Sequence, residues 1–181
     1  MHYSTTRAVI DGIGVERVMH KVKVEELTKE AFAPYGIVVE MPEGAKKESA
    51  VEDLWPGLVK WELDHETLEI AHGVCKKRPL VVEGLERHNT TYELLVPIKS
   101  DLIVPVASED DRENKDAQPL ARNVRGFLVK VGQAVFYDKG VWHLSPYPVE
   151  DEGPFFVVFK HKTAPDNMIM KELDEKVELE Y

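Results

Sequence analysis

The sequence predicts a mainly β protein, an antiparallel barrel or double-sheet jelly roll with few short helices. Short apolar runs recur along the chain, and clusters of Gly, Pro, Asn and Asp separate them. Runs of this length bounded by turn residues are typical of strands, and they leave little of the chain for helices. The runs that we expect to form strands are 22–24, 37–40, 58–63, 68–73, 94–98, 102–107, 122–131 and 155–160.

The two ends of the chain carry weaker signals. Residues 1–21 mix polarities and contain two glycines, which predicts a strand pair or an arm. Thr28 can cap a single helical turn that Pro34 and Gly36 terminate. The tail 168–181 mixes acidic, basic and apolar residues, so we expect a short helix or an arm there. Since no repeat or linker interrupts the chain, residues 1–181 are expected to form one domain.

Proline and charge predict which segments lie at the periphery. Pro97 and Pro105 stand inside apolar runs, so we expect edge strands or bulges there, because proline donates no ladder hydrogen bond. The polar segment 42–52 is expected to be a loop. The charged segment 108–119 is expected to be a solvated surface loop rather than a binding site.

The composition restricts the function and the compartment. A formal net charge of -10 argues against a general nucleic-acid or anionic-membrane surface. A few local cations could still hold a small anionic substrate. No apolar run approaches the ~18 residues of a membrane span, and the start has no hydrophobic signal core. The single cysteine, Cys75, has no internal disulfide partner, which favours a reducing compartment. We therefore expect a cytoplasmic protein that binds neither nucleic acid nor membranes.

The segment from Gly132 to His143 combines several local signals. Val135 and Tyr137 share one face of an extended segment. The turn residues that follow end at Gly140, which permits a positive φ angle. His143 then stands at the start of the next strand. This hairpin indicates half of a metal-binding or substrate-binding site.

The same segment resembles the second sequence motif of the cupin superfamily. Gly132, Gly140 and His143 match that motif, while Asp138 replaces its proline and Tyr147 its asparagine. The resemblance implies a cupin-like barrel with a partner motif upstream.

The partner motif lies at Glu86, His88 and Glu93, where cupins usually have two histidines and a glutamate. Glu86 and His88 share one strand face, whereas Glu93 must reach the site from beyond a break at 89–91. The resemblance thus implies a metal site formed by these three residues and His143. Two imidazoles and two carboxylates suit a divalent transition metal, and Mn, Fe, Ni and Zn all remain candidates.

A more specific resemblance is to the ureidoglycolate lyase family, and it spans roughly residues 24–167. It is carried by Glu30-Ala-Phe-Ala-Pro-Tyr-Gly36, Leu85-Glu-Arg-His88, Glu93, Pro97, Arg125-Gly-Phe127, Gln133, Tyr137, Lys139 and Val141-Trp-His143. The chain departs from the family pattern at 89–91, at Glu93 in place of Gln, and at Leu144 in place of a second histidine. The resemblance implies a homodimeric amidine-type carbon–nitrogen lyase that converts ureidoglycolate to glyoxylate and urea in purine and allantoin degradation.

The lyase hypothesis implies roles for further residues. Arg125 or Lys139 would pair with the substrate carboxylate. Tyr137 would donate a proton or a hydrogen bond, and the general acid and base remain unassigned. Trp142 is expected to serve packing, and Arg87 to face away from Glu86 and His88.

Two alternatives remain open. The same ligand set could serve another metal-dependent cupin enzyme, an isomerase or a dioxygenase acting on a small acid or sugar. The chain could also be a non-catalytic cupin that binds a small ligand.

Overall fold

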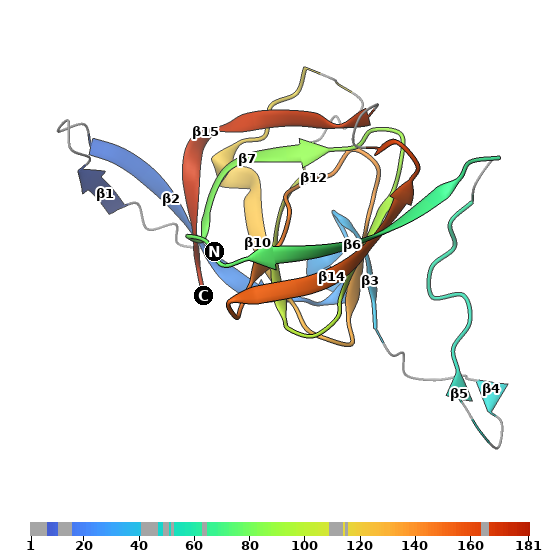
Figure 1. Cartoon of the computed structure of the whole chain (residues 1–181). Helices are drawn as coiled ribbons and strands as arrows, with labels where there is room; N and C mark the ends of the chain where they lie inside the picture. Colours follow the sequence, from blue (N-terminus) through green and yellow to red (C-terminus); the bar gives the residue numbers. More distant parts are fainter. Residues whose placement is uncertain are drawn as a thin grey trace.

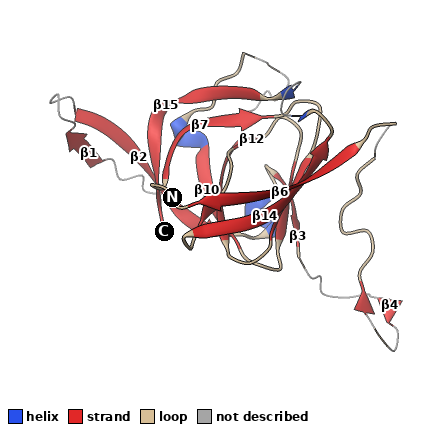
Figure 2. Ribbon diagram, viewed as in Figure 1, coloured by secondary structure: helices blue, strands red, loops and turns tan. Residues whose placement is uncertain are grey.

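The computed structural model consists largely of strands (Figure 2). It describes residues 7–10, 16–40, 47–48, 51, 53–62, 65–108, 114, 116–163 and 167–181. The strands are β1 (Arg7–Ile10), β2 (Glu16–Glu26), β3 (Gly36–Val39), β4 (Lys47–Glu48), β5 (Asp53–Leu54), β6 (Leu68–Lys76), β7 (Val81–Arg87), β8 (Glu93–Pro97), β9 (Leu102–Ala107), β10 (Val124–Val129), β11 (Ala134–Tyr137), β12 (Trp142–His143), β13 (Tyr147–Pro148), β14 (Glu152–Lys160) and β15 (Ile169–Glu180). The helical elements that lie wholly within the described residues are α1 (Lys29–Phe32) and the 3-10 turn η1 (Ala121–Asn123). The predicted mainly β fold with few short helices is confirmed.

Most strands belong to two sheets that enclose the interior (Figure 1). The first sheet has the order β1-β2-β10-β9-β12-β7-β15, with β13 paired to β9, and the second has the order β3-β11-β8-β14-β6. Strand β2 also pairs with β15, so both ends of the first sheet meet at β2. The predicted double-sheet barrel is therefore confirmed. Its strand pairs are antiparallel except that β2 runs parallel to β10 and β15.

Strand β9 is buried along its whole length because it separates two apolar cores. Val104 and Val106 point into a core that the second sheet completes. Ile103 and Ala107 point into another core, which the curled first sheet encloses and β15 helps to cover. The two-residue period of a strand thus supplies both cores from one element.

Pro105 lies within β9, and the predicted edge position is wrong for this strand. On one side Pro105 is opposite Gly126 of β10. On the other side β12 pairs with residues 106–107 and β13 with residues 102–103. Proline therefore stands where the ladder passes from one short strand to the next, a position that does not require its missing N–H.

The short helix α1 begins and ends as predicted. The Thr28 hydroxyl oxygen accepts a hydrogen bond from the Ala31 N–H at 3.1 Å. After the helix, Gly36 has a φ of +145°, and a Cβ there would lie 2.0 Å from the carbonyl oxygen of Phe136. Only glycine lets β3 approach β11 this closely.

The prediction of a strand at 58–63 is wrong for the residues that the structure describes. Residues 58–59 form a bend and residues 60–62 irregular backbone, and residue 63 lies outside the described residues. This part of the chain extends away from the barrel toward β4 and β5 (Figure 1). A strand needs a hydrogen-bonded neighbour, and none of the described strands pairs with residues 58–62.

The C-terminal tail is a strand, so the predicted helix or arm is wrong. β15 pairs with β7 in antiparallel and with β2 in parallel orientation. At the other end, the predicted strand pair is confirmed, because β1 and β2 are antiparallel partners.

Three further expectations concern the loops, membrane spans and the number of domains. The predicted loop at 42–52 lies largely outside the described residues, and Lys47–Glu48 within it form β4. Half of the predicted loop at 108–119 is described, and residues 116–119 form a turn and irregular backbone. No helix in the described part of the chain has the length and apolar character needed to cross a membrane. That residues 1–181 form one domain stays a prediction.

Candidate metal centre

Two short strands place Glu86 and His143 side by side. His143 of β12 is the direct partner of Glu86 of β7, and opposite residues of an antiparallel ladder project to the same face. Their neighbours Arg87 and Trp142 lie on the other face, where the guanidinium carbon is 4.4 Å from the centroid of the Trp142 ring. Trp142 is part of an apolar core, which confirms its packing role. Arg87 faces away from Glu86 and His88, as predicted.

The turn before β12 holds His143 close to His88. Gly140 has a φ of +74°, and the Val141 N–H donates to the Asp138 carbonyl at 3.3 Å. The Gly140 N–H donates to the His88 carbonyl at 2.9 Å. Since His88 directly follows β7, this bond ties the end of β7 to the turn. The tight turn predicted from the sequence is confirmed.

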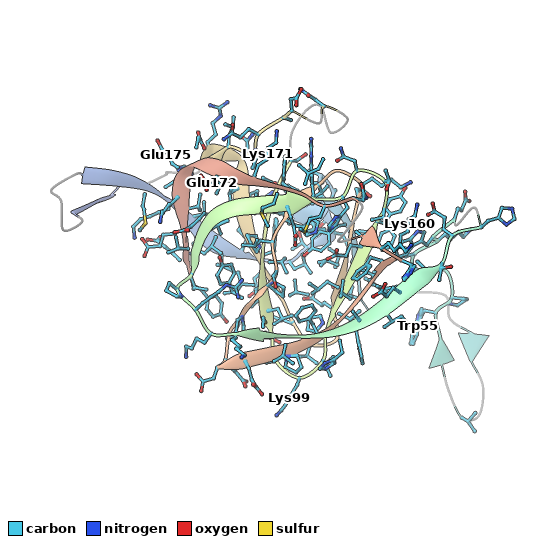
Figure 3. All side chains as sticks on the ribbon, turned by 45° about the horizontal axis from the view of Figure 1, so that its top comes forward. Trp55, Lys99, Lys160, Lys171, Glu172 and Glu175 are labelled. Atoms are coloured by element: carbon cyan, nitrogen blue, oxygen red, sulfur yellow. The ribbon has the colours of Figure 1, made fainter. Side chains whose placement is uncertain are left out.

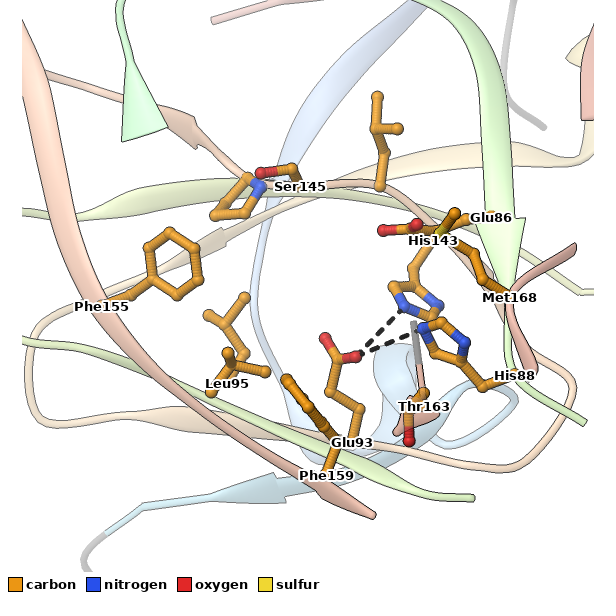
Figure 4. Close-up of a pocket in the computed structure, with 13 residues that line it drawn as sticks. Glu86, His88, Glu93, Leu95, His143, Ser145, Phe155, Phe159, Thr163 and Met168 are labelled. Atoms are coloured by element: carbon orange, nitrogen blue, oxygen red, sulfur yellow. Dashed lines mark ion pairs between the residues drawn. The ribbon is translucent and has the colours of Figure 1, made fainter. Parts of the chain in front are cut away.

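Glu93 reaches the same place from the second sheet. The chain leaves β7 of the first sheet and enters β8 of the second sheet at Glu93, which is the expected break. The Oε2 atom of Glu93 lies 3.5 Å from Nε2 of His88 and 3.7 Å from Nε2 of His143 (Figure 4). Potential ligand atoms of Glu86, His88 and His143 all lie within 4.8 Å of one another. The structure therefore brings the four predicted ligand residues together.

Backbone carbonyls orient both imidazoles. Nδ1 of His143 is 2.9 Å from the Val141 carbonyl oxygen, and Nδ1 of His88 is 3.2 Å from that of Asn167. A carbonyl only accepts, so each Nδ1 carries the proton, and the Nε2 of a neutral ring has a free lone pair. Nε2 of His143 is buried without a hydrogen-bond partner among the described residues. A buried acceptor in this state, beside a carboxylate, fits a metal ligand.

The charges in the cluster shift its pKa values. Burial alone raises the pKa of Glu93, but His143 and then His88 outweigh burial and lower that pKa to about 2. Burial alone lowers the pKa of His143, but the charge of Glu93, with a smaller contribution from Glu86, raises it above 6.5. Without a metal ion, Glu93 is therefore ionised, and His143 binds a proton more readily than free imidazole does.

Tyr137 lies against His143. The two rings are stacked, with centroids 4.7 Å apart and an interplanar angle of 12°. Tyr137 is fully buried, and its hydroxyl has no hydrogen-bond partner in the described structure. Burial, followed by the charges of Glu93 and Glu86, raises the pKa of Tyr137 well above 10, so the phenol stays protonated. Its role as a proton donor stays a prediction.

Arg125 and Lys139, the predicted substrate-binding cations, are not brought to the cluster. Arg125 donates hydrogen bonds of 2.8 and 2.6 Å to Glu25 and one of 3.0 Å to the Ala31 carbonyl. Lys139 is exposed, and its Nζ lies 4.9 Å from the centroid of the Tyr92 ring. Neither cation lines the cavity beside the cluster. Their binding of substrate stays a prediction.

The cavity beside the cluster has a volume of about 180 Å³. Much of its wall is apolar, and this wall was not predicted from the sequence. Besides the four polar residues, its described lining consists of Leu95, Leu144, Ser145, Pro146, Phe155, Val157, Phe159, Thr163 and Met168. No lysine or arginine is among these described residues. One sequence signal could have indicated the wall, because Phe155, Val157 and Phe159 alternate along a single predicted strand.

A barrel of two sheets with a histidine and glutamate cluster in its interior is the cupin-like arrangement that the two sequence motifs predict. The family model described as ureidoglycolate lyase matches residues 19–180. The chain belongs to the ureidoglycolate lyase family, which is a family of enzymes.

Individual relatives agree with this assignment. Ureidoglycolate lyase from Chelativorans sp. is 31% identical over 146 residues, which cover 77% of this chain and 85% of the relative. Ureidoglycolate lyase from Pseudomonas paraeruginosa is 32% identical over 154 residues, covering 77% and 83%. Among solved structures, a mutant of Bacillus subtilis oxalate decarboxylase has a TM-score of 0.39 and 17% identity, covering 59% of this chain and 24% of that chain. A likeness at this level carries no inference about the site.

Proposed function

We propose that this chain cleaves ureidoglycolate to glyoxylate and urea by metal-assisted collapse of a carbinolamine. One observation carries the proposal, namely the convergence of Glu86, His88, Glu93 and His143 beside an open cavity. The family and the names of the relatives supply the substrate.

The four residues fit a divalent transition metal. Two imidazole nitrogens and two carboxylates form a mixed donor set that suits Mn, Fe, Ni or Zn. The backbone carbonyls already orient both rings, so little ordering is needed on binding. A cation also offsets the negative charges of Glu86 and Glu93, which would otherwise repel an anionic substrate. When bound, such an ion acts as a Lewis acid that lowers the pKa of the substrate hydroxyl.

The reaction moves one proton from the substrate hydroxyl to the departing urea nitrogen. The carbon–nitrogen bond breaks as the carbonyl forms, and no water is consumed. Glu93, with a pKa of about 2, stays ionised near neutral pH and acts as a hydrogen-bond acceptor rather than an acid. Glu86 needs only one oxygen as a ligand atom, so its second oxygen is our candidate to receive the hydroxyl proton and return it to nitrogen.

The test is the release of both products from ureidoglycolate. We expect equal amounts of glyoxylate and urea from the metal-loaded protein, loss of activity on chelation, and recovery when the metal is restored. His88→Ala should lose nearly all activity. The matched control is His161→Ala, because His161 is exposed and pairs with Glu69 at 2.9 Å outside the cavity. Absence of glyoxylate from protein loaded in turn with Mn, Fe, Ni and Zn would contradict the proposal.

A further inference from the structure

The cavity has two chemically different ends. Glu86, His88 and His143 form a polar end, and Leu95 and Phe155 lie across the cavity from them (Figure 4). A substrate with its hydroxyl and carboxylate at the polar end would extend its nitrogen side toward the apolar wall.

The apolar wall is part of the second sheet and is fixed by strand pairing. Val157 of β14 is the direct partner of Leu95 of β8, so both side chains project to the same face. The ring of Phe155 is seated over Gly73 of β6, where a Cβ would lie 2.3 Å from the ring. The apolar wall formed by Leu95, Phe155 and Val157 therefore belongs to strands of the barrel and not to a loop.

This wall is poorly suited to an unsubstituted urea group. A urea end carries N–H and C=O groups, and burying them without partners is unfavourable. Away from the cluster, the described lining has two side-chain hydroxyls, on Ser145 and Thr163. The Thr163 hydroxyl already donates to the carbonyl of Lys160. The apolar side chains of the wall would instead favour a hydrocarbon group.

We propose that the chain prefers N′-substituted ureidoglycolates, whose distal nitrogen bears an apolar alkyl or aryl group, and cleaves them more efficiently than the unsubstituted compound. This inference rests on the proposed function, because that function places the hydroxy-acid end at the polar cluster. The products are the N-substituted urea and glyoxylate. The carbon–nitrogen bond breaks, the hydroxyl loses its proton and becomes the aldehyde carbonyl, and the leaving nitrogen gains a proton. Nothing is oxidised or reduced.

The first test compares N′-butylureidoglycolate with unsubstituted ureidoglycolate on the metal-loaded protein. We expect kcat/KM for glyoxylate release to be higher for the butyl compound by about tenfold or more, as for added methylenes in an apolar pocket. Val157→Thr places a hydroxyl in the wall at nearly constant volume and should lower this ratio severalfold. Val158→Thr is the matched control, since Val158 is the next residue and projects to the opposite face of the sheet.

A binding measurement supplies a readout that does not depend on turnover. N-butyloxamate and oxamate keep the acid and amide groups but lack the carbinol, so they cannot be cleaved. Calorimetry should show tighter binding of N-butyloxamate, by about tenfold, and Val157→Thr should reduce this difference.

The outcomes separate this inference from the proposed function. If unsubstituted ureidoglycolate is cleaved as well as the butyl compound and Val157→Thr leaves the ratio unchanged, the inference is overturned and the proposed function stands. If neither compound is cleaved, the proposed function fails and the inference fails with it.

Discussion

The Nε2 atom of His143 can hold either a proton or a metal ion, and the residues around it set the competition. Glu93 lies 3.7 Å from this atom, and its charge raises the pKa of His143 above 6.5. The pKa of Glu93 is about 2, so protons do not compete for Glu93 near neutral pH. Protonation of Nε2 of His143 therefore directly opposes metal binding.

We expect metal affinity to decrease as the pH falls through the raised pKa of His143. Below this pKa, Nε2 is protonated and has no lone pair for a bond to the metal. Above it, Nε2 is deprotonated and can bind the metal, so the affinity is higher. Below the pKa, the affinity should fall by about tenfold per pH unit for one competing proton. Titration of the metal-free protein with Zn or Mn on both sides of neutral pH measures this slope. An affinity that is independent of pH would contradict the role of His143 as a ligand.

Tyr137 offers a second test at the residue scale. Tyr137→Phe removes a buried hydroxyl without a described partner but keeps the stacking on His143, so we expect folding, metal content and turnover to persist. Tyr137→Ala removes the ring, and should cost about 3–5 kcal/mol of unfolding free energy and weaken metal binding. Urea unfolding, metal analysis and glyoxylate release measure these effects. If Tyr137→Phe kept its metal and lost its turnover, the hydroxyl would be the proton donor after all.

The candidate ligands could be predicted from the sequence because they stand in two short motifs that resemble those of cupins, and the local pattern agrees with this resemblance. Glu86 and His88 share a strand face through simple alternation, and the turn at Gly140 precedes His143 within a few residues. The surroundings of Arg125 could not be predicted in this way. Its partner Glu25 stands 100 positions earlier in the chain, and only the folded sheets bring the two together.

At the scale of elements, the sequence pattern was not sufficient to predict that the C-terminal tail forms strand β15. Ile169, Leu173 and Val177 are four positions apart, a spacing that a helix face shares. In the structure the register between β15 and β7 shifts between Glu172 and Val177. Extra residues at this irregularity break the simple alternation of a strand, and sequence alone does not reveal the long-range pairing.

We expect Leu179→Ala in β15 to destabilise the whole fold. Leu179 is 2% exposed and lies in the core that β15 helps to cover, so its truncation should cost about 2–5 kcal/mol. Glu175→Ala is the control on the same strand, because Glu175 is exposed on the outside of β15 (Figure 3). Urea unfolding of both metal-free variants measures the difference. Equal stabilities would mean that β15 is not an integral part of the barrel.

At the scale of the whole molecule, the outer face of the second sheet is unusually apolar. Strand pairing aligns one residue from each strand in a continuous row, Ile37, Phe136, Leu94, Val158 and Ile70. Phe136 in this row is only 3% exposed, because the ring of Trp61 packs on it with the centroids 5.3 Å apart. Ile70 is 70% exposed, and Phe156 and Val74 are exposed beside it. The exposed apolar patch that Ile70, Val74 and Phe156 form on β6 and β14 indicates a protein partner. We propose that it forms the interface of the homodimer that the family resemblance predicts.

Substitution in this outer face should separate the subunits. The unaltered protein should have a solution mass near twice the chain mass of 20.6 kDa, and Ile70→Lys should reduce it toward one chain. Met170→Lys is the control, because Met170 is 52% exposed but belongs to β15 of the first sheet. Size-exclusion chromatography with light scattering measures the masses. A monomeric unaltered protein, or a dimer that survives Ile70→Lys, would contradict this interface.

The most direct test of the metal centre is the metal content of protein purified without chelator. We predict about one equivalent of Mn, Fe, Ni or Zn in the unaltered chain and in His161→Ala, and its loss in His143→Ala. Mass spectrometry of the elements gives the amount and the identity of the ion together. If all three proteins stayed equally empty after reloading with each of these metals, Glu86, His88, Glu93 and His143 would not form a metal centre, and the metal-assisted lyase mechanism would be wrong.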